Sequence, residues 1–99
     1  MLQNLTREAL AESVNTPFRV NPQSADAFEI VLIEFKPGKS IPSQEQFSLL
    51  FRAPLEAPAQ QGIFQVQHDS VGEFELFLVP VRKDAQGLYY EAVFNRLID

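Results

Sequence analysis

The fold is decided by residues 62–78, which read GIFQVQHDSVGEFELFL. Apolar and polar side chains alternate in both halves of this segment, and a period of two places alternate side chains on one face of a strand. The predicted core-facing residues are Phe64, Val66, Phe74, Leu76 and Leu78. The link over residues 69–72 has hairpin length and ends in glycine. The segment therefore predicts two antiparallel strands, over residues 62–68 and 73–82.

The same alternation extends outward along the chain. Further strands are predicted at residues 18–20, 27–36, 46–52 and 88–97. Residues 27–36 carry apolar side chains on both faces, which predicts a strand covered on both sides. Thr6 is a suitable N-cap for a helix over residues 7–14. About six strands with one short N-terminal α-helix predict a mainly β fold, a small antiparallel β-barrel or sandwich.

Composition limits the classes of function. A length of 99 residues allows one domain, spanning residues 1–99. The net charge of −5, with basic residues scattered singly, disfavours nucleic acid and anionic membranes as partners. No apolar run reaches the ~20 residues that span a bilayer, and no secretory signal is recognisable. The absence of cysteine fits a reducing compartment, so we expect a cytoplasmic protein.

The nine phenylalanines recur at alternate strand positions. This spacing predicts that they belong to the core, where they leave little volume for a large internal ligand. Two longer connections, over residues 37–45 and 53–61, contain proline and are predicted recognition loops.

Residues 37–40 read PGKS, which resembles the end of a phosphate-binding loop. That motif needs a glycine where this chain has Ile33, and a helix must follow it. Ile41 and Pro42 follow instead. Nucleotide binding is therefore not predicted, and the sequence indicates no cofactor.

His68 is the only histidine, and Asp69 follows it. In one interpretation His68 is a general base that a carboxylate orients. In the other, which we favour, it lies at a strand end and hydrogen-bonds its own hairpin turn. One histidine without cysteine makes a zinc site improbable on chemical grounds.

Glu73, Glu75 and Glu91 are candidates for paired carboxylates that do acid–base work or bind calcium. Alternation places Glu73 and Glu75 opposite the core face, and the spacing of a calcium loop is absent. A solvated sheet face that resists edge aggregation is the preferred interpretation. We predict neither a metal site nor a catalytic residue.

Residues 89–96, YYEAVFNR, form the densest aromatic segment. They predict either a partner surface, where Tyr and Arg are enriched, or a core strand in which Arg96 pairs with a Glu across the sheet. The candidate binding residues are His68, Tyr89, Asn95 and Arg96.

Three segments, at residues 61–68, 72–81 and 90–96, together with FSLLF at 47–51, resemble a family of small bacterial proteins that is a domain of unknown function. The resemblance spans about residues 5–98. Genes of such proteins can lie near phage-tail-collar-like genes, which would imply an assembly or accessory role. No catalytic residue follows from the resemblance. It draws attention to His68, Pro80, Asn95 and Arg96, which lie within the matching motifs.

Two functions are therefore expected. The first is a non-enzymatic binding or assembly module, which contacts a protein partner or itself through loops or a sheet edge. The alternative is a small-molecule binder or hydrolase that uses His68 at a barrel-end pocket, with an unknown ligand. A ring-forming subunit of a phage-tail-like structure is a third possibility.

Overall fold

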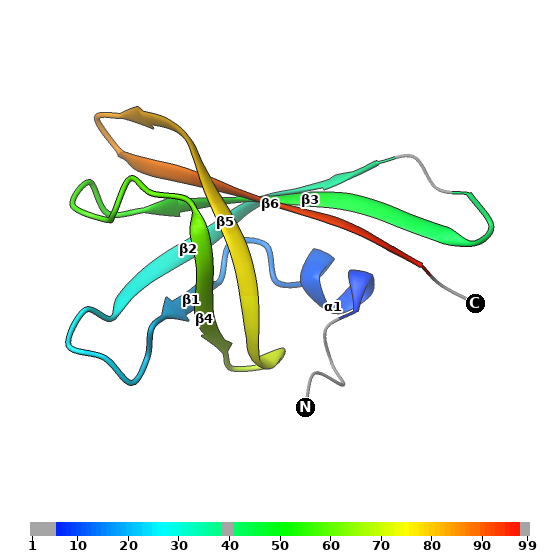
Figure 1. Ribbon diagram of the computed structural model, residues 1–99, viewed down its shortest axis with the longest axis horizontal. Helices are drawn as coiled ribbons and strands as arrows, with labels where there is room; N and C mark the ends of the chain where they lie inside the picture. Colours follow the sequence, from blue (N-terminus) through cyan, green and yellow to red (C-terminus); the bar gives the residue numbers. More distant parts are fainter. Residues whose placement is uncertain (1–5, 39–40, 98–99) are drawn as a thin grey trace.

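The computed structural model describes residues 6–38 and 41–97. Within them, six antiparallel strands close into a barrel in the order β1-β2-β3-β6-β5-β4, with one short helix (Figure 1). This confirms the predicted mainly β fold and selects the barrel over the sandwich. The elements are α1 (Arg7–Ala11), β1 (Pro17–Val20), β2 (Phe28–Pro37), β3 (Gln44–Ala53), β4 (Gly62–His68), β5 (Gly72–Asp84) and β6 (Gly87–Leu97).

Helix α1 begins as predicted, because the Thr6 hydroxyl accepts the Ala9 N–H at 3.0 Å. It ends at Ala11, earlier than the predicted residue 14. The Ser13 hydroxyl donates to the Ala9 carbonyl oxygen, and Asn15 adopts a φ of 72°. A left-handed residue cannot continue a helix, so the chain turns toward β1. Leu10 is fully buried.

The core contains the residues that alternation predicted. Buried side chains come from every strand and from the helix, and the largest fully buried ones include Tyr90, Phe18, Phe51, Leu10, Ile30 and Leu32. The predicted inner face of β5, with Phe74, Leu76 and Leu78, is buried as expected. Alternation therefore identified the inner face of β5 correctly.

Strand β2 differs from its predicted pattern at a β-bulge. Leu32 pairs with Phe51 and Glu34 pairs with Leu50, so Ile33 is the additional residue. The bulge reverses the alternation beyond it. Phe35 therefore lies on the same face as Leu49, its partner on β3, and stacks on Phe47 with ring centroids 5.2 Å apart.

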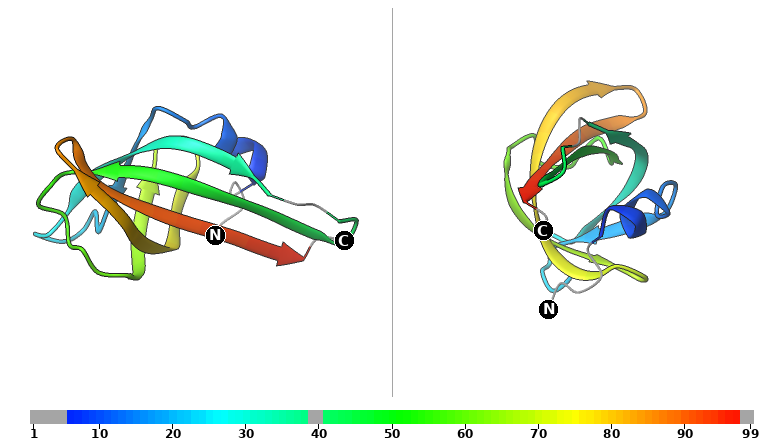
Figure 2. Two further views of the ribbon diagram at one scale, coloured as in Figure 1. Left: turned by 90° about the horizontal axis from the view of Figure 1, so that it is seen from above. Right: turned by 90° about the vertical axis from the view of Figure 1, so that its right-hand side faces the viewer.

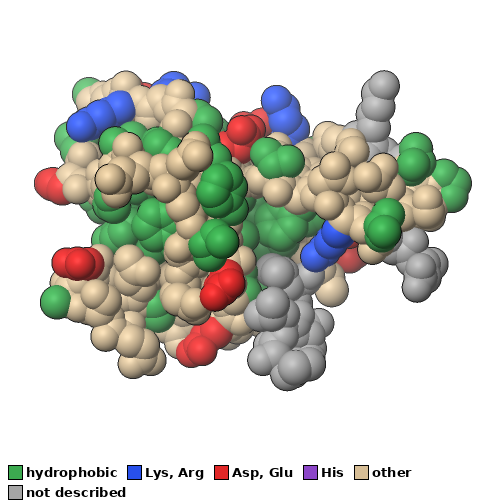
Figure 3. Space-filling model, viewed as in Figure 1, with side chains coloured by type: hydrophobic (Ala, Val, Ile, Leu, Met, Phe, Trp, Pro, Cys, Tyr) green, Lys and Arg blue, Asp and Glu red, His purple; other side chains and the backbone are tan. Residues whose placement is uncertain are grey.

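One phenylalanine contradicts the expectation that all nine belong to the core. Phe77 is 51% exposed on the outer face of β5, where it pairs with Ile63 of β4, which is 70% exposed. Hydrophobic side chains also gather over β4 and β5 in Figure 3. Alternation predicted the outer position of Phe77 correctly, but residue type alone suggested the core.

Strands β2, β3 and β6 continue beyond the barrel as a three-stranded projection that we call the arm, comprising residues 35–37, 44–49 and 92–97 (Figures 1 and 2). Strand β3 lies in its middle. Strand β5 pairs with β6 only as far as Glu91, through Val79. The arm is therefore a sheet with two margins, whereas the barrel is closed.

In the part of the chain that the structure describes, no helix is long and apolar enough to cross a membrane.

Candidate functional site

His68 lies at the end of β4 and is 7% exposed. Its Nδ1 accepts the backbone N–H groups of Ser70 and Val71, at 3.0 and 3.1 Å. These are the contacts expected if His68 lies at a strand end and hydrogen-bonds its own hairpin turn. The ring also packs against Phe18, with centroids 4.3 Å apart.

The hydrogen bonds of His68 define its tautomer. The Thr16 hydroxyl donates to the Ser13 carbonyl oxygen, so its own oxygen is left to accept from His68 Nε2, 2.8 Å away. His68 is therefore the neutral ring protonated on Nε2. The Asp69 carboxylate contacts Arg19 at 3.1 Å, and in the described residues it makes no hydrogen bond to the imidazole.

Burial lowers the pKa of His68, and Arg19 acts in the same direction, whereas the Asp69 carboxylate opposes them. The neutral tautomer and the lowered pKa both follow from the position of the ring between the core and the hairpin. A neutral histidine whose lone pair accepts two backbone N–H groups is suited to holding a turn, and that lone pair is not available to take a proton from a substrate.

Arg96 lies in the arm, on the face that carries a stack of three aromatic rings. Phe47 lies between Phe35 and Phe94, and its centroid is 4.6 Å from that of Phe94. The Arg96 guanidinium lies 5.6 Å from the centroid of Phe94, and its Nε donates to Glu45 Oε1 at 3.0 Å. The predicted pairing of Arg96 with a Glu across the sheet is therefore confirmed, with Glu45 on β3 as its partner.

Asn95 lies on the opposite face of the arm, where its Oδ1 accepts from Gln44 Nε2 at 2.7 Å. Tyr89 lies six residues away on the same strand, about 20 Å along it. It is buried in the β5–β6 hairpin, with Arg82 4.1 Å from its ring centroid. The four predicted binding residues thus fall into separate places: His68 in the core, Tyr89 in a hairpin, and Asn95 and Arg96 together in the arm.

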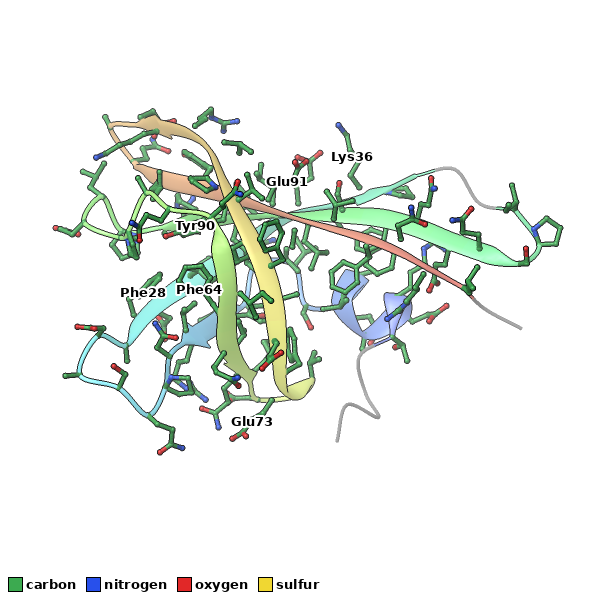
Figure 4. The ribbon with its side chains drawn as sticks, viewed as in Figure 1. Phe28, Lys36, Phe64, Glu73, Tyr90 and Glu91 are labelled. Atoms are coloured by element: carbon green, nitrogen blue, oxygen red, sulfur yellow. The ribbon has the colours of Figure 1, made fainter. Side chains whose placement is uncertain are left out.

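The three glutamates do not form a cluster. Glu73 and Glu75 accept from Gln67 and Gln65 on the outer face of β4–β5. Glu91 lies where the arm joins the barrel, and in Figure 4 its side chain points to the same side as that of Lys36. Among the described residues, no group of three His, Cys, Asp or Glu side chains is suited to hold a metal ion.

A pocket of about 600 Å³ lies between residues 21–28 and the loop over residues 54–60. Phe28 lines it, and Figure 4 shows Phe28 near Phe64 and Tyr90 at this end of the barrel. The Tyr90 hydroxyl donates to the Pro58 carbonyl oxygen, which ties the loop to the barrel. His68 does not line this pocket.

The open margin of β6 is a feature that residue types did not reveal. The Gly38 N–H donates to the Gln46 carbonyl oxygen, so the backbone groups of Gln46 point toward β2 and those of Phe47 toward β6. Phe47 pairs with Phe94. By this alternation, Phe94 faces β3, and the N–H and C=O groups of Val93, Asn95 and Leu97 face the open margin.

Proline supports the same assignment independently. Pro80 pairs with Tyr90 and has no N–H, so this is a non-hydrogen-bonded pair, and Glu91 makes the hydrogen bonds to β5. Val93 and Leu97 are 70% and 81% exposed. The three residues with open backbone groups thus carry exposed side chains of apolar, amide and apolar type. Alternation in residues 88–97 shows which side chains share a face, but the point at which β5 leaves β6 decides where the margin opens.

Neither the curated proteins nor the solved structures contain a match to this chain. A family model described as Domain of unknown function (DUF6916) matches residues 5–94. The match includes α1, five complete strands and most of β6, and it confirms the expected resemblance to a domain of unknown function. The chain therefore belongs to the DUF6916 family.

Proposed function

We propose that the protein is a non-enzymatic binding or assembly module that contacts a protein partner through its arm. The observation that carries this proposal is the open margin of β6, where Val93, Asn95 and Leu97 present backbone donors and acceptors. Unpaired strand edges are templates for another strand, and natural proteins usually cover them or place charges on them. Here the three residues with outward backbone groups have uncharged side chains, and the nearby Arg96 is paired with Glu45 on the other face.

The arm has the rigidity that such a contact needs. Its three strands are hydrogen-bonded to one another, and the Phe35–Phe47–Phe94 stack fills one face. A preformed strand loses little conformational entropy when a partner pairs with it. Strand addition to a rigid edge is a recurring way to recognise an extended segment.

The test is affinity capture from an extract of the native host, followed by mass spectrometry. Wild-type bait is compared with Asn95→Pro, which removes one outward N–H and leaves the β3-facing groups of Phe94 and Arg96 in place. We expect proteins, including untagged copies of this chain, that wild type retains and the variant loses. Identical captured sets for the two baits, or no captured protein in any growth state, would refute the proposal.

The family resemblance extends this proposal to an accessory role in a phage-tail-like assembly. An assembly subunit forms closed rings or filaments when its contact joins different surfaces of adjacent copies. Light scattering would then give a fixed multiple of the chain mass larger than two for a ring, or a mass that grows with concentration for a filament. We also propose a cytoplasmic location, which the absence of cysteine supports.

The alternative, a small-molecule binder or hydrolase based on His68, has weaker support. Its proposed base lies in the core, its lone pair is occupied, and it does not line the pocket at the loop end. The test is an NMR titration of His68 with candidate ligands. A ligand-dependent change in its pKa would revive this alternative.

A further inference from the structure

We propose that the partner at the β6 margin is a second copy of this chain, and that the two arms pair antiparallel with Asn95 facing Asn95. The inference rests on the proposed function and names its partner. In this arrangement β2, β3 and β6 of each copy join into one continuous six-stranded sheet. The two barrels lie at opposite ends of it, related by a two-fold axis through the Asn95 pair.

The backbone alternation restricts the register. Only Val93, Asn95 and Leu97 have outward N–H and C=O groups in the described part of the open margin, so hydrogen-bonded pairs must join members of this set. With the axis centred on Asn95, Val93 of each copy pairs with Leu97 of the other copy, and the two Asn95 residues pair with each other. All three residues then pair, which gives about six backbone hydrogen bonds.

Shifting the register by two residues in either direction is unfavourable. An axis at Phe94 leaves Leu97 opposite Glu91, whose backbone groups already bond to Val79. An axis at Arg96 places two Arg96 side chains opposite each other, and like charges in directly opposed positions are destabilising. Each shift also forms one fewer hydrogen-bonded pair. The axis at Asn95 is therefore favoured, because it forms the most backbone hydrogen bonds and keeps the two Arg96 side chains apart.

The side chains are complementary in the same register. Val93 and Leu97 lie symmetrically on either side of Asn95 and on one face of the strand, so each apolar side chain meets an apolar one. The Asn95 amides meet at the axis, where an amide can both donate and accept. On the other face, Arg96 lies opposite Phe94 of the second copy, a pairing of cation and aromatic ring.

The margin is accessible among the described residues. Figure 2 shows β6 as one margin of the arm and β2 as the other, with α1 on the β2 side. On that side, the backbone groups of Leu32 already bond to Asn15 and Thr16. The β6 margin is therefore the uncovered one among the described residues. The arm extends this margin beyond the barrel (Figure 1).

The experiment is sedimentation equilibrium from about 10 µM to 1 mM, a range chosen because pairing one short strand belongs to the weak class of interfaces. We expect a reversible monomer–dimer equilibrium. Val93→Lys should raise the dissociation constant about tenfold or more, because two-fold symmetry changes the interface at two places. Leu97→Glu alone should weaken it similarly.

The Val93→Lys/Leu97→Glu double variant tests the register. It places opposite charges across the interface twice, so dimerisation should recover and then weaken with added salt. Ile63→Lys is the matched control, since Ile63 is also 70% exposed but lies on β4, and it should leave the dimer unchanged. Amide exchange at Val93, Asn95 and Leu97 should slow as wild-type concentration rises.

A wild type that remains monomeric at 1 mM refutes self-pairing, and so does a dimer that Val93→Lys leaves intact. Failure of the double variant to recover refutes the register centred on Asn95. These failures remain separate from that of the proposed function. A monomer that captures another protein through the same margin would refute only the dimer, whereas a monomer that captures nothing would refute both.

Discussion

At the scale of single residues, His68 shows how burial and backbone donors fix a protonation state. Its Nδ1 accepts two N–H groups, and protonation there would replace two attractive contacts with repulsive ones. Desolvation lowers its pKa in the same sense. The ring is therefore neutral in the folded protein at neutral pH, whereas in the unfolded chain it titrates near 6.5.

This predicts how stability depends on pH. Because the folded pKa of His68 is below the unfolded one, its contribution is complete above about pH 6.5 and falls as pH decreases toward the folded pKa. Denaturant unfolding should give a smaller free energy of unfolding at pH 5.5 than at pH 7.5. His68→Asn, which can still accept at the turn but does not titrate, should show a smaller decrease. A wild type that becomes more stable on acidification would contradict this assignment.

Replacement of the side chain tests its structural role. His68→Ala removes the packing against Phe18 and leaves the N–H groups of Ser70 and Val71 without their acceptor, so we expect a loss of about 2–4 kcal/mol in the free energy of unfolding. His68→Asn should lose less, since its amide oxygen can accept in a similar turn. Equal losses for the two variants, measured by urea unfolding at pH 7.5, would show that the turn contacts contribute nothing.

At the scale of elements, the two hairpins of the second half depend on different properties of glycine. Gly72 has a φ of 95° with open space where a β-carbon would lie, whereas Gly87 has a φ of 158° and faces the Ala53 carbonyl oxygen. Gly72→Ala should cost about 1–2 kcal/mol for the left-handed backbone alone. Gly87→Ala adds a clash with backbone and should cost clearly more, measured by urea unfolding. A smaller loss for Gly87→Ala would contradict this order.

Sequence alternation predicted most of the elements because each inner face is made by large apolar residues at a period of two. It located β4 and the inner face of β5 correctly, and it gave the helix its N-cap. It could not locate the bulge at Ile33, because one additional apolar residue among Val31, Leu32 and Ile33 leaves no change in residue type. Uninterrupted alternation from Leu32 would therefore place Phe35 on the face opposite to the one it occupies.

The candidate site was less predictable for a related reason. Tyr89 and His68 were predicted as binding residues from their residue types, because aromatic and titratable side chains are common in binding sites. Both are buried, and residue type alone does not reveal burial. The open margin depends on where β5 leaves β6, which is a property of strand pairing between distant segments. Alternation fixes the face of a strand but not its neighbours, so Val93 and Leu97 could not be recognised as margin residues.

At the scale of the whole molecule, closure of the barrel depends on its shortest strand. Strand β1 pairs with β4 through only two residue pairs, Arg19 with Gln67 and Val20 with Val66, whereas β3 and β6 pair through ten. Side chains reinforce this seam, because Arg19 donates to Gln67 at 3.1 Å and contacts Asp69. A seam with few hydrogen bonds and one solvent-exposed ion pair should open at a lower free energy than global unfolding.

Native-state hydrogen exchange measures this difference. The Asn21 amide, which bonds to the Gln65 carbonyl oxygen across the seam, should exchange faster than the amides of Phe51 on β3 and Tyr90 on β6, which face each other across the β3–β6 ladder. Arg19→Met should accelerate exchange at Asn21 and leave Phe51 and Tyr90 nearly unchanged, because opening the seam leaves the β3–β6 ladder intact. Arg52→Met, an exposed change on β3, is the control and should not affect Asn21. Equal exchange rates at all three amides would mean that the barrel opens only as a whole, with the seam as stable as the long strands.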